Sequence, residues 1–165
     1  GTVLALEGIC DGWYKVTYSG KSGYVSSDYI TITTEPASPS SGLGAEVVAY
    51  AEQYLGCPYA WGGNGPSSFD CSGFVCWVFS NSGVHNLPRT TAQGIYDQCT
   101  PVSAADAKAG DIIFFTGTYN AGRPVTHVGI YCGNGTMVHC GDPIQYTSIN
   151  TSYWQSHFYG FGRLN

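Results

Sequence analysis

The chain has 165 residues, enough for one full globular core or for one domain with an additional fragment. Apolar residues make up 43% and charged residues only 10%, a composition that excludes an intrinsically disordered chain. The net charge of −5 provides no basic surface for phosphate groups, so we expect no nucleic-acid partner. The 23 Gly, 13 Tyr and 4 Trp residues indicate a turn-rich protein whose aromatic, weakly charged surface suits sugars and peptides.

The apolar runs and the cysteines of the sequence indicate its compartment and its relation to membranes. No apolar run approaches the roughly 18 residues of a spanning helix, so we expect no membrane insertion. The chain starts at Gly1 without a visible signal peptide, which we interpret as a processed chain or a piece of a longer one. Seven cysteines fit one working thiol plus up to three disulfides in a secreted protein. Reduced cysteines buried as small hydrophobes are an equally compatible alternative.

The first region, residues 1–33, reads as three short strands at residues 3–6, 13–18 and 23–25, with a hairpin turn at residues 19–20. Such a short segment cannot close a stable barrel alone, because domains below roughly 40 residues need disulfides, metals or partners. Residues 34–44 are rich in Pro, Ser and Gly without periodicity, which predicts a linker. We therefore expect a second domain over residues 45–165.

The second region begins with helical periodicity and ends with strand-like segments. An apolar stripe predicts a helix over residues 45–55 with Gly56 at its C-cap, followed by a helix from near Cys71 to residues 81–83 and a short one over residues 90–96. Strands are expected at residues 111–115, 126–132, 136–140 and 160–164. Helices followed by an antiparallel sheet predict the α+β class.

Cys71 is the candidate nucleophile. It lies in the sequence Asp-Cys-Ser-Gly at the start of the second predicted helix, and a helix N-terminus favours the reactive thiolate. Val75 and Val78 follow at i+4 and i+7, so the Cys71 side chain should face the sheet at the rim of the core. No other cysteine in the sequence combines a helix start with a preceding loop of small residues.

Two of the four histidines, His127 and His139, lie in successive predicted strands separated by Gly-Asn-Gly at residues 133–135. A two-residue Asn-Gly turn would place them on opposite faces of the sheet. A three-residue loop with a left-handed Gly135 would instead set His139 opposite Gly129 and diagonal to His127 on one face. In that second register His127 can take the thiol proton and later protonate the leaving amine, while His139 fixes its tautomer. Backbone N–H groups at the helix start would hold the oxyanion.

Structural roles are the common alternative for each of these residues taken singly, and His85 and His157 have no apparent partners in the sequence. A zinc site from His139, Cys140 and another cysteine is disfavoured, because no C-x-x-C pair exists and the spacing does not fit a closed site. We therefore expect neither a metal nor another cofactor.

Five motifs in order resemble the NlpC family of cell-wall cysteine peptidases, which are papain-like in fold. The resemblance covers roughly residues 44–165. The motifs are PYAWGG at residues 58–63, FDCSGFV at 69–75, AGDIIFF at 109–115, HVGIY at 127–131 and GNGTMVH at 133–139. The resemblance implies three catalytic residues, namely Cys71, His127 and His139.

The same resemblance implies a substrate and further site residues. Tyr59 would reach the oxyanion position, and Asp70 and Ser72 would contact the amino end of the substrate. The family typically hydrolyses the bond between γ-D-glutamate and a diamino acid in peptidoglycan stem peptides. This implies a secreted or wall-associated bacterial protein whose partners are the stem peptide and the cell wall.

Residues 12–30 resemble the C-terminal half of a bacterial SH3 domain, a wall-binding module, and the first half of that module is absent from the sequence. Two other functions remain open. One is an amidase of the related CHAP type, or a cross-bridge endopeptidase, with cysteine and histidine in the same order. The other is an inactive wall-binding module, although the retained set of Cys71, His127, His139 and Tyr59 favours an enzyme.

Overall fold

The computed structural model describes residues 5–10, 13–18, 21–26 and 42–164. The chain divides into two compact units, Gly1–Ser40 and Ser41–Asn165. The candidate site residues all belong to the second unit.

The first unit contains a three-stranded antiparallel sheet of order β1-β2-β3, with β1 (Ala5–Cys10), β2 (Trp13–Tyr18) and β3 (Lys21–Ser26). Tyr18 pairs with Lys21, and the predicted turn between them lies outside the described residues, as do residues 3 and 4. The prediction that the first strand ends at residue 6 is wrong, because β1 continues past an irregularity after Leu6 and pairs as far as Cys10. The resemblance to SH3 stays a prediction.

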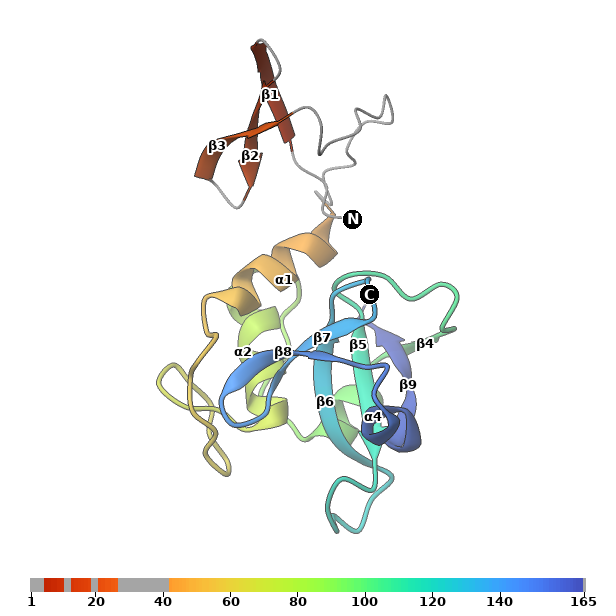
Figure 1. Ribbon diagram of the computed structural model, residues 1–165. Coiled ribbons are helices and arrows are strands. Elements are labelled where there is room, and N and C mark those ends of the chain that lie inside the picture. The colour runs from red at the N-terminus through yellow and green to blue at the C-terminus, as the bar shows by residue number, and fades with distance from the viewer. Residues whose placement is uncertain (1–4, 11–12, 19–20, 27–41, 165) are drawn as a thin grey trace. The chain divides into compact units, whose positions relative to one another are not determined.

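The second unit is a mixed α+β domain, which confirms the predicted class. Its antiparallel sheet has the order β4-β9-β5-β6-β7-β8. The strands are β4 (Thr100–Val102), β5 (Ile112–Thr116), β6 (Val125–Tyr131), β7 (Thr136–Cys140), β8 (Ile144–Ser148) and β9 (Phe158–Arg163). The helices are α1 (Leu43–Glu52), α2 (Cys71–Asn81), α3 (Ala92–Tyr96) and α4 (Ser152–His157) (Figure 1).

Helix α1 differs from its prediction at both ends. It begins at Leu43, two residues before the expected start, and its regular part ends at Glu52. After Glu52 the hydrogen bonds become shorter in sequence, because the N–H groups of Tyr54 and Leu55 donate to carbonyls three residues earlier instead of four. The apolar stripe therefore runs on beyond the helix through a set of turns, which periodicity alone cannot separate from a helix.

The central strand β5 is buried on both faces of the sheet. Ile112 and Phe114 pack into the core beneath α2, whereas Ile113 and Phe115 pack into a second cluster with Trp154 of α4. These four side chains of β5 are fully buried. Burial of this much apolar area is the main stabilising contribution to the domain, at about 25 cal/mol per Å². Residues of α1, α2 and α3 thus pack on one face of the sheet, and the short α4 packs against the other through Trp154.

Three elements, β4, β8 and α4, were not predicted. Strand β8 has only one buried residue, and α4 has none, so neither carries an apolar period strong enough to detect. Strand β4 has three residues and pairs along its whole length with β9. These elements are held by pairing with the rest of the sheet or by packing against it, and two of them contribute to the site.

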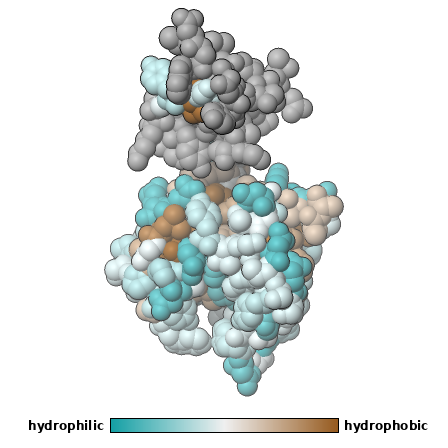
Figure 2. Space-filling model, in the orientation of Figure 1, coloured by the Kyte–Doolittle hydropathy of each residue, from teal (hydrophilic) through white to brown (hydrophobic). Residues whose placement is uncertain are grey.

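The surface shown in Figure 2 is mostly pale, with weakly polar residues and only small patches of strongly apolar ones on the second unit. This agrees with a chain that has few charges and many Tyr, Ser and Gly residues. Among the described residues, no helix is both long and apolar enough to cross a membrane.

Candidate active site

Helix α2 starts at Cys71, and its first turn is fixed by the residue before it. Asp70 is the N-cap, and its carboxylate accepts a hydrogen bond from the Gly73 N–H at 2.7 Å. The same carboxylate accepts from the Gly62 N–H at 3.1 Å, which ties the preceding loop to the helix. Gly73 allows this close approach, because a Cβ atom there would lie only 2.1 Å from the carbonyl oxygen of Gly63.

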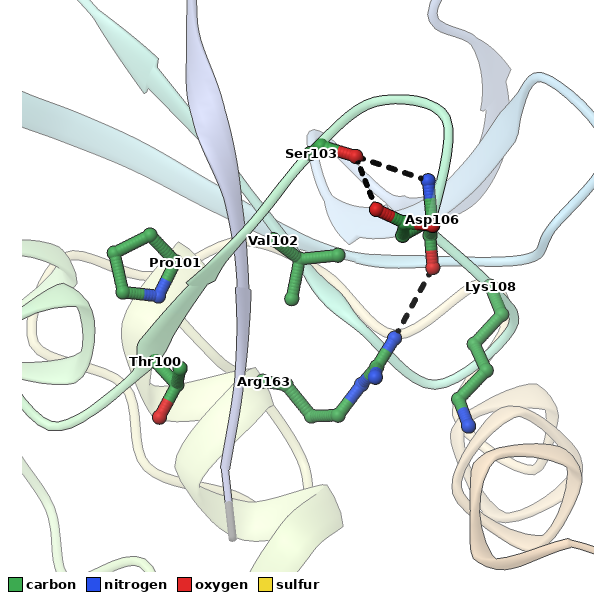
Figure 3. A pocket seen from close by; sticks show the side chains of 7 residues that line it. All are labelled: Thr100, Pro101, Val102, Ser103, Asp106, Lys108 and Arg163. Atoms are coloured by element: carbon green, nitrogen blue, oxygen red, sulfur yellow. Dashed lines mark hydrogen bonds between the residues drawn. The ribbon is translucent and has the colours of Figure 1, made fainter.

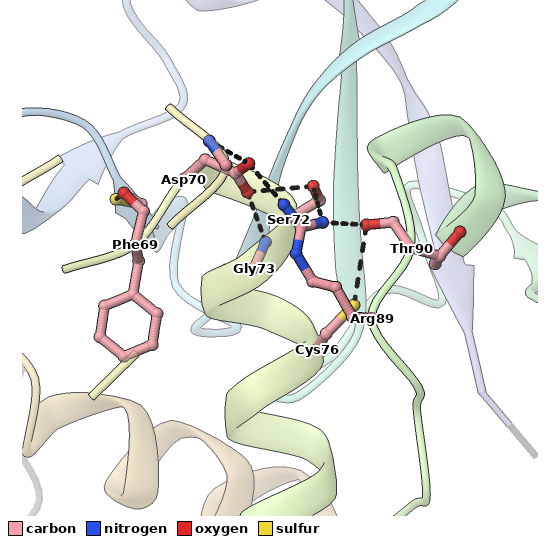
Figure 4. A network of polar contacts seen from close by, with 9 residues as sticks. Phe69, Asp70, Ser72, Gly73, Cys76, Arg89 and Thr90 are labelled. Atoms are coloured by element: carbon pink, nitrogen blue, oxygen red, sulfur yellow. Dashed lines mark hydrogen bonds and ion pairs between the residues drawn. The ribbon is translucent and has the colours of Figure 1, made fainter. Parts of the chain in front are cut away.

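Arg89 completes the network around the helix start (Figure 4). Its guanidinium contacts the Asp70 carboxylate at 2.5 Å, donates to the Ser72 hydroxyl at 2.9 Å and also donates to the carbonyl of Thr90. The Ser72 hydroxyl in turn lies 3.2 Å from Asp70. Sequence reasoning missed Arg89, which lies 18 residues after Cys71 with no motif to connect them.

The Cys71 thiol lies where α2 meets β6. Burial, with a smaller contribution from the nearby Asp70 carboxylate, raises the pKa of Cys71 to about 11. The backbone N–H groups of Ser72 and Val128 and the Arg89 guanidinium act in the opposite direction. Val128 follows His127 in β6, so the sulfur contacts the same stretch of strand as the histidine. The helix N-terminus alone does not produce a resting thiolate, because burial outweighs it.

His127 and His139 are hydrogen-bonded through Nε2 of the first and Nδ1 of the second, at 2.9 Å. The three-residue register is confirmed, since the Cys132 N–H donates to the Thr136 carbonyl and Ile130 pairs with Val138. The same register sets His139 opposite Gly129, where a Cβ atom would lie 3.0 Å from Cβ of His139.

The histidine pair has two further neighbours that the sequence did not reveal. The Trp154 ring stacks on His127 at 5.3 Å between centroids and meets His139 edge-on at 5.2 Å. The Thr147 hydroxyl lies 2.9 Å from Nε2 of His139. Trp154 belongs to α4 and Thr147 to β8, two of the unpredicted elements. Because these two elements were not predicted, their contacts with the histidines could not be predicted either.

Both imidazoles are neutral in this environment. Burial, assisted by His139, lowers the pKa of His127 to about 3, and burial lowers the pKa of His139 to about 4. His127 has only its Nδ1 left to face a thiol, because its Nε2 faces His139. If Nδ1 is the free nitrogen, Nε2–H donates to His139, whose own proton lies on Nε2 and points to Thr147. The pair can therefore accept a proton at a single atom.

Two tyrosines flank the thiol. Burial and the nearby Cys71 sulfur raise the pKa of Tyr59 to about 12, so this phenol stays protonated and can donate a hydrogen bond. Burial and Cys71 also raise the pKa of Tyr119, which lies in the loop between β5 and β6. The Tyr119 ring meets Trp61 edge-on at 5.7 Å. The sequence indicated Tyr59 but not Tyr119.

The other two histidines, for which the sequence indicated no partners, make different contacts. Nδ1 of His157 is 2.7 Å from the Thr116 carbonyl, while the His85 backbone N–H donates to Phe79. The six cysteines with described side chains are free thiols. Within the described part of the chain, no three His, Cys, Asp or Glu residues form a group that could hold a metal ion.

A surface depression lies elsewhere, beside β4 and β9 (Figure 3). Its guanidinium is engaged within the protein, because Arg163 binds Asp111 at 2.6 and 2.8 Å and the Asp106 carbonyl at 3.2 Å. The Ser103 hydroxyl donates to the Asp106 carboxylate at 2.6 Å. These contacts stabilise the edge of the sheet, and the candidate site is the cluster of residues around Cys71.

Helices packed on an antiparallel sheet, with a cysteine at a helix start and paired histidines on neighbouring strands, define a papain-like α+β domain. The profile of the NlpC/P60 family matches residues 56–163, and the chain belongs to this family. It is 45% identical over 132 residues to the bifunctional muramidase/DL-endopeptidase CwlT of Bacillus subtilis, covering 79% of this chain and 39% of that protein. It is 44% identical over 119 residues to the probable endopeptidase p60 of Listeria seeligeri, covering 72% of this chain and 22% of that protein.

The fold is similar to solved structures of the family. A Staphylococcus aureus NLP/P60 protein superposes with a TM-score of 0.71 at 43% identity, covering 84% of this chain and 46% of that one. The NlpC2 protein of Trichomonas vaginalis superposes with a TM-score of 0.63 at 29% identity, covering 96% of this chain and 61% of that one. This chain therefore spans less than half of each of the two curated relatives and of the staphylococcal structure.

Proposed function

We propose that this chain is a peptidoglycan hydrolase that cleaves the γ-D-glutamyl–diamino acid bond of stem peptides through a thioester on Cys71. The observation that carries the proposal is the 2.9 Å hydrogen bond that joins His127 to His139. His127 lies in β6, and the backbone of the next residue in that strand, Val128, contacts the Cys71 thiol. Membership of the NlpC/P60 family and similarity to a protein named DL-endopeptidase support the same activity.

The reaction begins from a neutral thiol and a neutral imidazole. As the Cys71 sulfur attacks the γ-carbonyl carbon, His127 Nδ1 takes the thiol proton, and charge separates only in the transition state. The oxyanion is held by backbone N–H groups at the start of α2 and by the Tyr59 phenol. When the tetrahedral intermediate collapses, His127 gives the proton to the leaving amine, and the acyl group stays on sulfur as a thioester. Water, deprotonated by His127, then releases the acid and restores the thiol.

Asp70 and Ser72 are proposed to contact the amino end of the substrate. The hydrogen bonds that they already make limit how they can do so. The Asp70 carboxylate already accepts from Gly62, Ser72 and Gly73 and pairs with Arg89. A substrate ammonium would have to share this carboxylate or displace one donor. We therefore assign Asp70 first to holding the helix start, and through it the position of the nucleophile.

The setting of the reaction follows from the substrate. A chain that cuts stem peptides acts outside the cytoplasmic membrane of a bacterium or on its cell wall, which suits the weakly charged, tyrosine-rich surface. The first unit is proposed to be part of an SH3-like wall-binding module, on the basis of the resemblance of residues 12–30.

The test is digestion of the tetrapeptide L-Ala-γ-D-Glu-diamino acid-D-Ala, with mass spectrometry of the products. Release of L-Ala-γ-D-Glu by the wild type, and not by Cys71→Ala, is the expected result. An intact peptide together with cleavage of purified sacculi at the sugar–peptide bond would replace the proposal with the CHAP-type amidase. Binding to sacculi without any cleavage, equal in both proteins, would identify an inactive wall-binding module.

A further inference from the structure

We propose that Thr147 is a positioning residue, the end of a polar line that runs from the reacting thiol through His127 and His139. It acts on the reaction only through His139 and touches neither the nucleophile nor the substrate. This inference rests on the proposed function in one respect, the role of His127 as the base.

The three side chains form a diagonal across neighbouring strands. His139 in β7 is directly opposite Gln145 in β8, and Thr147 is opposite Met137, so Thr147 is the diagonal neighbour of His139 on the same face. Continuing the register of β6 and β7 makes His127 the diagonal neighbour on the other side. The two contacts that result, His127 to His139 and His139 to Thr147, are both 2.9 Å long.

The far nitrogen of His139 depends on this hydroxyl. His139 is 4% exposed, and the Trp154 ring lies edge-on against it at 5.2 Å. A buried N–H without an acceptor loses its hydration with no compensation, a cost that grows when the ring system carries a charge. Thr147 supplies the acceptor from a strand whose other residues, apart from Ile144, are exposed to solvent.

The direction of the protons explains why an oxygen is needed here. A hydroxyl can donate or accept while the histidines are neutral. Once His127 holds the thiol proton at Nδ1, its Nε2–H must donate to His139, and the His139 Nε2–H must donate to Thr147. Thr147 is then an acceptor only, and its hydrogen bond stabilises the charged state that follows proton transfer. At the opposite end of this line the Cys71 thiol contacts the backbone of Val128, the residue after His127, and the charged groups that act on this thiol are Asp70 and Arg89.

A purely structural role for Thr147 is testable, because valine has the same shape and is at least as good a strand former. Thr147→Val removes the acceptor and keeps the packing, whereas Thr147→Ser keeps the acceptor and removes a methyl group. Ser148→Ala is the matched control, since Ser148 is the next residue of β8 on its other face.

The first measurement is the pH dependence of kcat/KM for the tetrapeptide. We expect Thr147→Val to lower the plateau by about tenfold or more, the effect of one hydrogen bond to a charged group. The acid limb should move to lower pH, because the cation loses stabilisation and the histidine pair binds its proton less well. Thr147→Ser should restore both features, and Ser148→Ala should leave both unchanged.

The second measurement needs no turnover. Alkylation of Cys71 by iodoacetamide, followed peptide by peptide with mass spectrometry, reports the thiolate at each pH. Thr147→Val should move its midpoint to higher pH, and Thr147→Ser should return it. The inference is overturned if Thr147→Val has the same thermal unfolding midpoint as the wild type and leaves both pH profiles unchanged. Thr147 would then be only a strand residue. A wild type without peptidase activity but with the expected alkylation shifts would contradict the proposed function and leave the inference standing.

Discussion

Trp154 shields the histidine pair, and replacing it with alanine should expose both imidazoles to water. The Trp154 ring stacks on His127 at 5.3 Å, meets His139 at 5.2 Å and packs against Phe115 at 4.5 Å. Burial is the first cause of the low pKa of His127, about 3, so hydration should raise it toward the ordinary value. Recovery of about half of the difference would move the acid limb of kcat/KM upward by about 1–2 pH units.

The same substitution removes packing from a half-buried ring, which should cost about 2–4 kcal/mol of unfolding free energy. The assay combines the pH profile of kcat/KM with urea denaturation of the same samples. Trp154→Phe should keep most of the shield and give a smaller shift. Tyr159→Ala is the control, because the Tyr159 ring meets Tyr96 edge-on at 5.1 Å and has no recorded contact with the histidines. Loss of stability in Trp154→Ala with an unmoved acid limb would refute the reasoning that burial sets the histidine pKa values.

Three other predictions follow from the site. Arg89→Lys should lower kcat/KM and destabilise the domain by about 1–3 kcal/mol, because one ammonium cannot replace the guanidinium contacts to Asp70 and Ser72. Thermal unfolding and steady-state kinetics check this prediction, with Lys108→Gln as the control. Gly129→Ala should displace His139 and abolish most activity at a cost of about 1–3 kcal/mol, whereas Gly160→Ala, with nothing within 4 Å, should be tolerated in both assays. Both histidines have folded pKa values below the unfolded value, so the unfolded chain binds more protons and stability should fall between about pH 6.5 and 4, by up to about 1.4 kcal/mol per pH unit for each histidine. His139→Gln should reduce that slope in denaturation curves, and an unchanged slope would contradict the assignment.

The parts of the fold that bury an apolar face were predictable from the sequence. The period of α2 and the glycine-rich loop before it located the helix start at Cys71, and the Gly-Asn-Gly loop offered a register that brings the histidines together. The structure selected the three-residue loop, in which Gly135 has a φ of 77°. Local rules thus reached the central geometry because turn length, register and facing side chains determine one another.

The contacts that adjust the site were not predictable, because they come from elements with little local signal. Thr147 lies in a mostly exposed strand, Trp154 in a six-residue helix, and Arg89 in a loop between helices. Each reaches the site only through the tertiary arrangement of the sheet. The protonation state was also missed, because the favourable helix N-terminus at Cys71 is visible in sequence and the burial that outweighs it is not.

The most direct test of the account compares Cys71→Ala with Cys99→Ala in digestion of the stem tetrapeptide. Cys99 is a half-buried free thiol whose neighbours include Gly162 and Asp111, and it has no recorded contact with Cys71 or the two histidines. The account predicts that Cys71→Ala lowers the rate by at least about a thousandfold and still folds, whereas Cys99→Ala retains activity. Release of L-Ala-γ-D-Glu at the wild-type rate by Cys71→Ala would contradict the central claim that this thiol is the nucleophile.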